Sequence, residues 1–396
     1  MKAVVLAAGE GARMGPFTAS EPKVMIPVGN RPILEHVVRA LVLAGVPDIV
    51  LVVGYRRERI MSTFQDGNAF GARIEYAVEG KQLGTAHALL EARQRVQGPF
   101  VVVNGSNLLD RVAIGDLVAG GAGPSILITE SDAPSNYGVV LLSGNRLAQI
   151  VEKPREPVGN MINTGAYLLD ESVFPVIEGL ARQGKHDLPG AVAALSAQKA
   201  VSAIRTRGLW SDALYPWDLL RLNAEVLKGI PEEKAGTIEK GVTIRGKVLV
   251  RKGTILRAGT YIQGPVVIGE GCEIGPHAVL LAATSLGDNV RVGPFGLVDN
   301  SILMDDVDVG PGCILQDTVA GAGAKLRAAV VAARGKASVQ IEGEWHEVDP
   351  VGGMIGEDAE IEGGAVIESG TVVGARAHAG ANARLRGTIP NGGIVV

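Results

Sequence analysis

Two glycines and two cations near the N-terminus have the types and spacing of a phosphate-binding loop. Gly9 and Gly11 follow an apolar run, and Arg13 and Lys23 come after them. Glycine lets a backbone approach a polyphosphate closely and offer its N–H groups, while arginine and lysine supply charge for phosphate oxygens. A plain strand and turn with solvated basic residues would look the same. These residues alone leave both interpretations open.

A second polar cluster, Asn104-Gly105-Ser106, ends a valine-rich run that begins at Phe100. Such a run is typical of a buried strand, and Asn-Gly marks the turn at its end. The turn carries the neutral hydroxyl of Ser106, a weak ligand for any metal.

The elements that position both clusters alternate between strand and helix over residues 1–229. We expect strands at Lys2–Ala7, Asp48–Val53, Arg73–Val78 and Phe100–Val103, and helices at Pro32–Ala44, Arg57–Gln65 and Thr85–Val96. This alternation predicts an α/β domain with a mixed, mostly parallel sheet and helices on both faces. Ligands of such sheets bind beyond the carboxyl ends of the strands, where both clusters fall.

Residues 230–396 follow a different pattern. An aliphatic residue recurs at every sixth position from Ile238 to Val298, and again from Ile355 to Val373. A period of six predicts a parallel β-helix with three short strands per coil. Between these runs, over about Met304–Gly353, the register is lost, and we expect a loop excursion around Lys336–Asp349. The chain is thus predicted to hold two domains, 1–229 and 230–396.

Composition excludes several classes of protein. The 396 residues carry a formal net charge of −4, so no basic surface for nucleic acid is expected. No stretch approaches the roughly 18 apolar residues of a membrane span. The first apolar run is too short for a signal peptide, and two cysteines are too few for a disulfide framework. We therefore expect a cytoplasmic protein. The 54 glycines fit a repeat with many tight turns.

The string LAAGEGARMGPFTASEPKVMIPV, from Leu6 to Val28, resembles the phosphate-loop signature of sugar-1-phosphate nucleotidylyltransferases, except that Ala12 replaces the usual Thr or Ser. The chain is similar to the bifunctional family that joins such a domain to a left-handed β-helix acetyltransferase, as in glucose-1-phosphate thymidylyltransferase-like and N-acetylglucosamine-1-phosphate uridylyltransferase-like proteins. The resemblance implies that Arg13 and Lys23 are catalytic, and that Leu6, Ala8, Gly9 and Gly11 contact the nucleotide.

Further motifs follow in the family's order. QLGTAHAL resembles the base-reading segment, which implies that Gln82, Gly84 and Thr85 bind the nucleoside. YGVV, VEKP and NTGAYLL resemble the sugar-phosphate segments, and they imply sugar or phosphate contacts from Gly138, Glu152, Lys153 and Asn163. The segment GKHDLPGAV departs from the family pattern.

WSDALYPWDLL resembles the closing motif and implies that Asp212 is a ligand of Mg²⁺, the expected cofactor. The second carboxylate of the family belongs to an N-G-D motif, but here Ser106 takes that position. Three interpretations stay open. Asp212 and the phosphates hold the ion with a water, or another acid such as Asp110 reaches in, or the domain binds nucleotides without turnover.

The β-helix resembles an acyltransferase domain that uses acetyl-CoA and a histidine base. GPGCILQDT aligns with the base-bearing segment, and Pro311 occupies the histidine position. VVAARGK lacks the downstream asparagine. His277, His346 and His378 remain as candidate bases, and Cys272 and Cys313 fit as packing residues. The resemblance also implies a homotrimer or a dimer of trimers built through the β-helix.

The sequence thus predicts an enzyme that joins UTP or dTTP to a sugar-1-phosphate. Its products would be pyrophosphate and a UDP- or dTDP-sugar, such as UDP-N-acetylglucosamine or dTDP-glucose. A catalytically impaired nucleotide-sugar-binding regulatory or scaffold paralogue is the alternative, because Ser106 and Pro311 replace expected catalytic residues. Acyl transfer alone is a third hypothesis, for which His346 would be the base.

Overall fold

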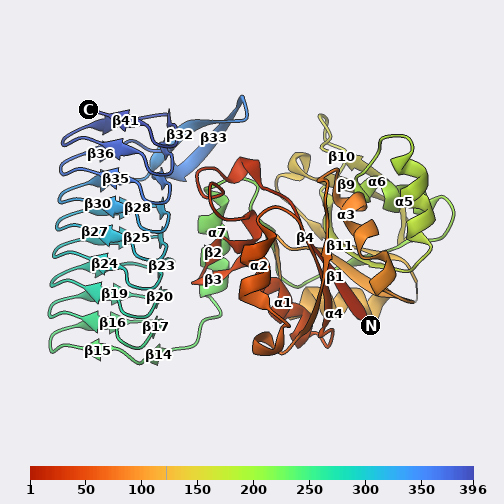
Figure 1. The fold of residues 1–396 in the computed structure, drawn as a ribbon, viewed down its shortest axis with the longest axis horizontal. Coiled ribbons are helices and arrows are strands. Elements are labelled where there is room, and N and C mark those ends of the chain that lie inside the picture. Colours follow the sequence, from red (N-terminus) through yellow and green to blue (C-terminus); the bar gives the residue numbers. More distant parts are fainter. Residues whose placement is uncertain (122) are drawn as a thin grey trace. The chain divides into compact units, whose positions relative to one another are not determined.

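The predicted fold class is confirmed by the computed structural model, which describes residues 1–121 and 123–396 (Figure 1). The chain divides into two units. The first unit holds Met1–Glu10, Pro22–Met25 and Pro32–Asp212, and the second holds Gly11–Glu21, Ile26–Arg31 and Ala213–Val396. The phosphate-loop sequence is therefore shared between the units.

A mixed sheet of nine strands forms the centre of the first unit, in the order β5-β4-β1-β6-β11-β8-β12-β10-β9. Its strands are β1 (Lys2–Ala7), β4 (Asp48–Val53), β5 (Arg73–Val78), β6 (Phe100–Asn104), β8 (Ser125–Glu130), β9 (Gly138–Ser143), β10 (Arg146–Glu152), β11 (Met161–Leu169) and β12 (Ser202–Arg205). β5, β4, β1 and β6 run parallel, while β11 is antiparallel to β6 and β8. A small second sheet pairs β7 (Asn107–Leu109) with β13 (Trp210–Asp212).

Helices cover both faces of the large sheet, which explains the continuous apolar runs in its strands. In β1, Val4 and Leu6 join one core cluster, and Ala3, Val5 and Ala7 join the other. The first cluster includes residues of α3 (Thr85–Glu91), α5 (Val173–Ala181) and α6 (Leu188–Ser196). The second includes residues of α1 (Ile33–Leu43), α2 (Arg57–Phe64) and α4 (Arg111–Gly120).

The predicted strands and helices of this unit agree with the structure to within a residue, with one exception. The helix expected over Thr85–Val96 is shorter, because α3 ends at Glu91 and a 3-10 turn follows at Arg93–Arg95. Leu89, Ala92 and Val96 are all buried in one cluster. The apolar spacing that suggested one helix thus continues across the change in backbone conformation.

The β-helix of the second unit has three parallel sheets. The first contains β14 (Glu233–Lys234), β17 (Val248–Val250), β20 (Val266–Ile268), β23 (Thr284–Leu286), β26 (Ile302–Leu303), β29 (Val319–Ala320), β34 (Met354–Ile355), β37 (Val372–Val373) and β40 (Thr388–Ile389). The second contains β15 (Thr237–Ile238), β18 (Ile255–Leu256), β21 (Glu273–Ile274), β24 (Arg291–Val292), β27 (Asp308–Val309), β30 (Lys325–Leu326), β35 (Glu360–Ile361), β38 (His378–Ala379) and β41 (Ile394–Val395). The third contains β16 (Thr243–Arg245), β19 (Tyr261–Gln263), β22 (Val279–Leu280), β25 (Leu297–Asp299), β28 (Ile314–Gln316), β31 (Val331–Ala332), β36 (Val366–Ile367) and β39 (Arg384–Leu385).

The period of six is lost over Met304–Gly353 as predicted, but the coils continue through most of that stretch. In the first sheet Ile268 pairs with Leu286, and Leu286 pairs with Leu303, which lies one residue closer along the chain. The next coil, from Leu303 to Ala320, has the same shorter length. A turn that is one residue shorter moves the next aliphatic position by one residue, while the strands of successive coils stay paired.

The expected loop excursion is an antiparallel hairpin, formed by β32 (Gly335–Ile341) and β33 (Glu344–Val351). Glu342 and Gly343 both have positive φ, at 50° and 86°, as a two-residue turn of type I′ requires. Val339 is buried, and a Cβ at Gly370 would lie 2.8 Å from its side chain, so the base of the hairpin packs on a neighbouring coil. We call this element the β32–β33 hairpin.

Within the second unit, α7 (Asp218–Leu227) packs on the first β-helix sheet. Leu227 and Ile230 form a cluster with Leu249 and Val267, whose side chains face outward from the coils. Asn223 is fully buried, and its amide donates to the carbonyl of Ala283 at 2.8 Å. Its Oδ1 accepts from the Ser285 hydroxyl at 2.9 Å, so α7 is held by both apolar and polar contacts.

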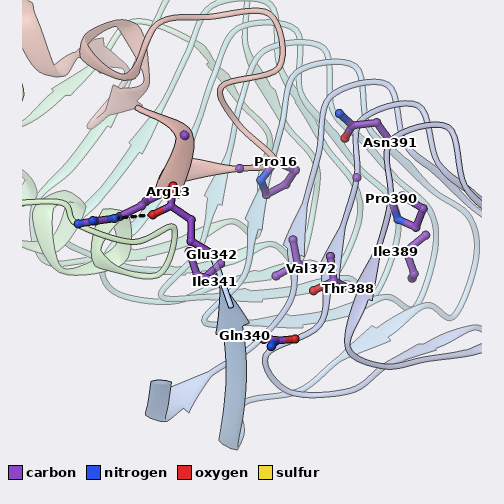
Figure 2. A pocket seen from close by; sticks show the side chains of 13 residues that line it. Arg13, Pro16, Gln340, Ile341, Glu342, Val372, Thr388, Ile389, Pro390 and Asn391 are labelled. Carbon is purple, nitrogen blue, oxygen red and sulfur yellow. Dashed lines mark hydrogen bonds and ion pairs between the residues drawn. The ribbon is translucent and has the colours of Figure 1, made fainter. Parts of the chain in front are cut away.

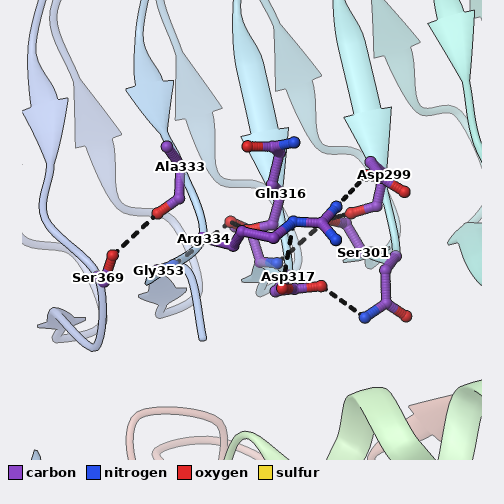
Figure 3. A network of polar contacts seen from close by, with 10 residues as sticks. Asp299, Ser301, Gln316, Asp317, Ala333, Arg334, Gly353 and Ser369 are labelled. Carbon is purple, nitrogen blue, oxygen red and sulfur yellow. Dashed lines mark hydrogen bonds and ion pairs between the residues drawn. The ribbon is translucent and has the colours of Figure 1, made fainter. Parts of the chain in front are cut away.

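A buried carboxylate lies next to Arg334, the residue before the β32–β33 hairpin (Figure 3). Asp317 is 1% exposed and adopts a positive φ. Its Oδ1 accepts from the Asn300 amide at 2.5 Å, and Oδ2 lies 3.4 Å from the Nε of Arg334. Arg334 also pairs with Asp299 and directly precedes β32. This network ties the base of the hairpin to two neighbouring coils.

We expect Arg334→Met to destabilise the second unit by about 1–3 kcal/mol, because it leaves the buried Asp317 carboxylate without its cation. Arg384→Met, which removes an exposed ion pair to Glu368, is the matched control and should have little effect. Differential scanning calorimetry of both variants measures this. Equal melting temperatures for the two would contradict the role given to the network.

Candidate active site

The carboxyl ends of parallel strands bring the two polar clusters of the first unit to one edge of the sheet. Leu6 of β1 lies opposite Asn104 of β6 in the register. The backbone after β1 and the turn at Gly105–Ser106 therefore leave the sheet together. The N–H of Gly105 donates to the carbonyl of Leu6 at 2.8 Å, which fixes this turn against β1.

The nucleotide-binding residues predicted at the end of β1 differ in exposure. Leu6 and Ala8 are buried, and the Ala8 carbonyl accepts from the N–H of Tyr55 at 3.0 Å. Gly9 is exposed, and a Cβ there would meet no atom within 4 Å. The backbone at Gly9 is therefore open to a ligand, whereas Leu6 and Ala8 contribute mainly to the core.

Ser106 and Asp212 are brought to the same place by the pairing of β7 with β13. Asn107, the residue after Ser106, lies opposite Asp212 in this two-stranded sheet. Asp212 is 6% exposed, and its Oδ1 accepts from the Tyr137 hydroxyl at 2.8 Å. Trp210 packs edge-on against Tyr137, with ring centroids 5.3 Å apart. Sequence reasoning missed the contact between Tyr137 and Asp212, because these residues lie 75 positions apart in the chain.

The donors at this edge fit Mg²⁺ in one specific way. Asp212 supplies one carboxylate and Ser106 a neutral hydroxyl. Asp110, the acid considered as a substitute, instead caps α4 by accepting from the N–H of Ala113 at 2.8 Å. Mg²⁺ is commonly held by one or two carboxylates together with substrate phosphates. The residues present therefore suit an ion that arrives with a nucleotide.

The predicted base-reading segment packs against the segment around His186. Gly84 has a φ of 150°, and a Cβ there would lie 2.5 Å from the carbonyl oxygen of His186, so this position requires glycine. The Thr85 hydroxyl accepts from the N–H of Leu188 at 2.9 Å. Thr85 thus holds the neighbouring segment, while the side chain of Gln82 is exposed.

A buried acid that sequence reasoning missed lies next to this segment. Glu79 is 6% exposed, and its Oε1 lies 2.8 Å from the Nδ1 of His87. Glu79 directly follows β5, so it lies at the same sheet edge as the loop after β1. Its only signal in the sequence was a charged residue after an apolar strand, which is also typical of a surface turn.

Gly138, Glu152 and Lys153 come together where β9 pairs with β10. Gly138 lies opposite Glu152, and a Cβ at Gly138 would lie 2.7 Å from a Glu152 carboxylate oxygen. Desolvation raises the pKa of Glu152, while the ammonium of Lys153 lowers it and the charge of Asp187 raises it. Lys153 is exposed and adopts a φ of 42°. Asp187, from the segment that departs from the family pattern, therefore lies near the predicted sugar site.

Asn163 is already engaged by its own strand. Its amide nitrogen donates to the Tyr167 hydroxyl at 2.7 Å, and its oxygen accepts from the N–H of Gly165 at 2.9 Å. A primary amide has two N–H donors and two acceptor lone pairs. One of each remains for a sugar hydroxyl, and the existing bonds fix the orientation of the amide.

The two cations that are predicted to be catalytic belong to different units. Lys23 begins a 3-10 turn (Lys23–Met25) in the first unit and is half-buried. Gly11 and Arg13 belong to the second unit, where the Nε of Arg13 lies 2.9 Å from the Oε2 of Glu342 at the tip of the β32–β33 hairpin (Figure 2). The hydrogen bond to Glu342 raises the pKa of Arg13, although desolvation opposes it.

Pro311 stands at the position where the resemblance places the acyl-transfer base. Pro311 lines a cavity of about 410 Å³ with Pro276 and Pro294. His277 stacks on Phe295 at 5.4 Å, and His378 faces Glu360 across neighbouring strands. Burial raises the pKa of the Cys272 thiol to about 11 and also raises that of Cys313, so neither thiol is activated.

His346, the base of the acyl-transfer hypothesis, packs at a tilt against the Tyr215 ring, with ring centroids 4.3 Å apart, and its centroid lies 6.0 Å from that of the Trp217 ring. Within residues 1–121 and 123–396, no three His, Cys, Asp or Glu side chains are grouped closely enough to hold a metal by themselves. Among the same residues, no helix is both long and apolar enough to span a bilayer.

Comparison with known proteins places the chain in a family. The family model described as Nucleotidyl transferase matches residues 2–229, and the bacterial transferase hexapeptide model matches 247–282 and 265–300. The bifunctional protein GlmU of Methanococcus vannielii is 32% identical over 96% of this chain and 94% of its own length. A glucose-1-phosphate thymidylyltransferase of Streptomyces antibioticus is 31% identical over 74% of this chain and 84% of its own. A Bacillus anthracis crystal structure, named as a glucose-1-phosphate thymidylyltransferase, gives a TM-score of 0.54 at 29% identity, covering 59% of this chain and 98% of that one.

We expect Tyr137→Phe to weaken divalent-ion binding in the presence of nucleotide by about tenfold, because it removes the hydroxyl that orients the Asp212 carboxylate. The phenyl ring keeps the contact with Trp210, so the fold should be retained. Titration of Mn²⁺ by electron paramagnetic resonance measures this without turnover. Tyr76→Phe, which removes a hydroxyl bonded to the carbonyl of Gln65, is the control. Equal Mn²⁺ affinity in both variants would contradict an orienting role for Tyr137.

Proposed function

Because the chain belongs to the nucleotidyl transferase family, we propose that it is a sugar-1-phosphate nucleotidylyltransferase that makes a UDP- or dTDP-sugar and releases pyrophosphate. The observation that carries the proposal is the register of β6, β7 and β13, by which Ser106 and Asp212 share one edge with the loop after β1. The names of the relatives from Methanococcus vannielii and Streptomyces antibioticus support it. We assign this chemistry to residues 1–229.

The reaction is an in-line displacement at phosphorus. A phosphate oxygen of the sugar-1-phosphate forms a bond to the α-phosphorus, and the bond to the bridging oxygen of pyrophosphate breaks. Such a transfer depends on positioning and charge neutralisation rather than on covalent help from the protein. Arg13 and Lys23 stabilise the charge of the transferring and leaving groups. Mg²⁺, when bound beside Asp212, would neutralise phosphate oxygens.

The sugar-phosphate side is supplied by the other strands of the same sheet. Lys153 is exposed and offers its ammonium to the phosphate of the sugar. Glu152, Asn163 and the backbone of Gly138 offer acceptors and donors to sugar hydroxyls. Gln82, Gly84 and Thr85 are proposed to hold the nucleoside, and the exposed Gln82 has room to turn toward a base.

The β-helix is proposed as an assembly domain rather than as a second catalytic centre. Pro311 replaces the base that acyl transfer from acetyl-CoA would need, and the nearby thiols stay protonated. An outward-facing stripe on the third sheet is almost wholly apolar and runs in register through Tyr261, Val279, Leu297, Ile314, Val331 and Val366. Contiguous apolar surface of this kind is typical of an interface, and a homotrimer is the closed assembly that we propose.

Magnesium dependence and a cytoplasmic location complete the proposal. Both cysteines are free and buried, as expected in a reducing compartment. The alternative of a catalytically impaired paralogue rests only on the sequence replacements at Ser106 and Pro311. The relative from Streptomyces antibioticus carries the name of an enzyme and does not support this alternative.

We expect the purified chain to release pyrophosphate from UTP or dTTP when Mg²⁺ and a suitable sugar-1-phosphate are present. A panel of sugar phosphates in a coupled pyrophosphate assay measures this. Lys153→Ala should raise KM for the sugar phosphate by about tenfold or more with a smaller effect on KM for the nucleotide, because it removes a charge-assisted contact. No release with any pair would refute the proposal. Arg155→Ala, a neighbouring surface cation, is the matched control.

Ser106→Asp separates the enzyme from the impaired paralogue. An enzyme adapted to one carboxylate should already turn over without the change and should mainly need less Mg²⁺ after it. A chain that is inactive as found and gains activity with Ser106→Asp would instead support the alternative.

We expect Ile314→Glu to break the assembly, because it places a charge in the centre of the apolar stripe on the third sheet. Ile314 is 39% exposed. Light scattering after size exclusion should report a trimer for the wild type and monomer for the variant. Leu43→Glu, at a 70% exposed position of α1, is the control. A monomeric wild type would refute the trimer.

A further inference from the structure

The β32–β33 hairpin carries an acidic residue, Glu342, that forms an ion pair with Arg13 of the phosphate loop. Glu342 is one of the two turn residues at the tip of this hairpin, and its Oε2 accepts from the Nε of Arg13 at 2.9 Å (Figure 2). Both side chains are about half exposed, at 45% for Arg13 and 50% for Glu342. The pair is therefore accessible to solvent and to a competing anion.

The hairpin is held in place independently of this ion pair. At its base, Arg334 pairs with the buried Asp317. In its middle, His346 packs at a tilt against Tyr215, and Tyr215 stacks on Trp217 with ring centroids 5.0 Å apart. These contacts fix the path of the hairpin, so the position of Glu342 does not depend on Arg13 alone.

A cavity of about 330 Å³ lies beside the pair, between the phosphate-loop segment and the last coils (Figure 2). Its lining includes hydrogen-bonding side chains of Gln340, Thr388 and Asn391. Amide and hydroxyl groups can donate to a carboxylate. When Arg13 binds another anion, the Glu342 carboxylate can therefore turn into this cavity and accept hydrogen bonds there.

We infer that Glu342 is a competing carboxylate, which holds Arg13 in the nucleotide-free protein and is displaced from it when a nucleoside triphosphate binds. This inference rests on the proposed function, which assigns Arg13 to the triphosphate. A triphosphate carries several negative charges and outcompetes one carboxylate for a guanidinium. Glu342 thereby lowers the affinity for the triphosphate and makes the β32–β33 hairpin part of the nucleotide-binding step.

The expected size of the effect follows from the exposure of the pair. Removing this exposed ion pair should tighten triphosphate binding by about two- to fivefold, which corresponds to about 0.4–1 kcal/mol and lies within the range of exposed ion pairs. Because exposed charges are screened by salt, the gain should shrink as ionic strength rises.

Isothermal titration calorimetry of the full chain with inorganic tripolyphosphate, and with dTTP or UTP, tests this without turnover. Glu342→Gln should lower Kd two- to fivefold, and Glu347→Gln, which removes an equal charge from the same hairpin, should leave it unchanged. In an Arg13→Gln background the effect of Glu342→Gln should vanish, as a double-mutant cycle requires for a direct pair. The pyrophosphate assay should show a matching decrease in KM for the nucleotide.

An unchanged or raised Kd in Glu342→Gln would overturn the inference, since it would mean that Glu342 is neutral to binding or positions Arg13 for it. An equal effect of Glu347→Gln would also overturn it, because the effect would then be one of net charge. If the chain binds triphosphate but releases no pyrophosphate, the proposed function is refuted. The Kd values of the variants for triphosphate then still test the inference. A wild type that binds no triphosphate would refute both.

Discussion

The pairing of β7 with β13 is the constraint on which the candidate site depends. It joins the strand after the Ser106 turn to the strand that ends at Asp212, although these segments are far apart in the sequence. The carbonyl of Thr164 reinforces it by accepting from the Asn107 amide and from the Trp210 indole, both at 2.8 Å. Without this pairing, the buried carboxylate would have no fixed relation to the end of β6.

A single carboxylate changes how a metal ion would be held. With Ser106 in the second position, the edge carries one negative charge less than the family's pattern. The attraction for Mg²⁺ before nucleotide binds is correspondingly smaller. The hydrogen bond from the Tyr137 hydroxyl then fixes the orientation of the Asp212 carboxylate.

The sequence carried the architecture because each signal was local. Alternating strands and helices, and an aliphatic residue at every sixth position, follow from side-chain direction in each element. The sequence does not show where the turns are one residue shorter, because small residues, Ala320 and Ala332, take core positions that larger aliphatic residues fill elsewhere. The hairpin could not be predicted for a different reason. Its turn signal, Glu342-Gly343, is short, and its strands are flanked by a repeat of another period.

The site was predictable only where motifs are contiguous. Glycines and cations of the phosphate loop, and the acid of the closing motif, could be identified in the sequence. The contacts from Tyr137 to Asp212 and from Glu342 to Arg13 could not, since they join positions 75 and 329 residues apart. Such contacts depend on the paired strands and packed coils between them, and no local pattern encodes them.

The conformation of Glu342 argues against a purely stabilising role for its ion pair. A non-glycine residue with φ of 50° is in the left-handed region, which costs roughly 1–2 kcal/mol. The exposed ion pair between Glu342 and Arg13 stabilises the folded protein by about 0–1 kcal/mol. Asparagine or glycine would satisfy the turn at lower cost. The presence of a glutamate at this position is therefore better explained by what its charge does to Arg13 than by the stability of the hairpin.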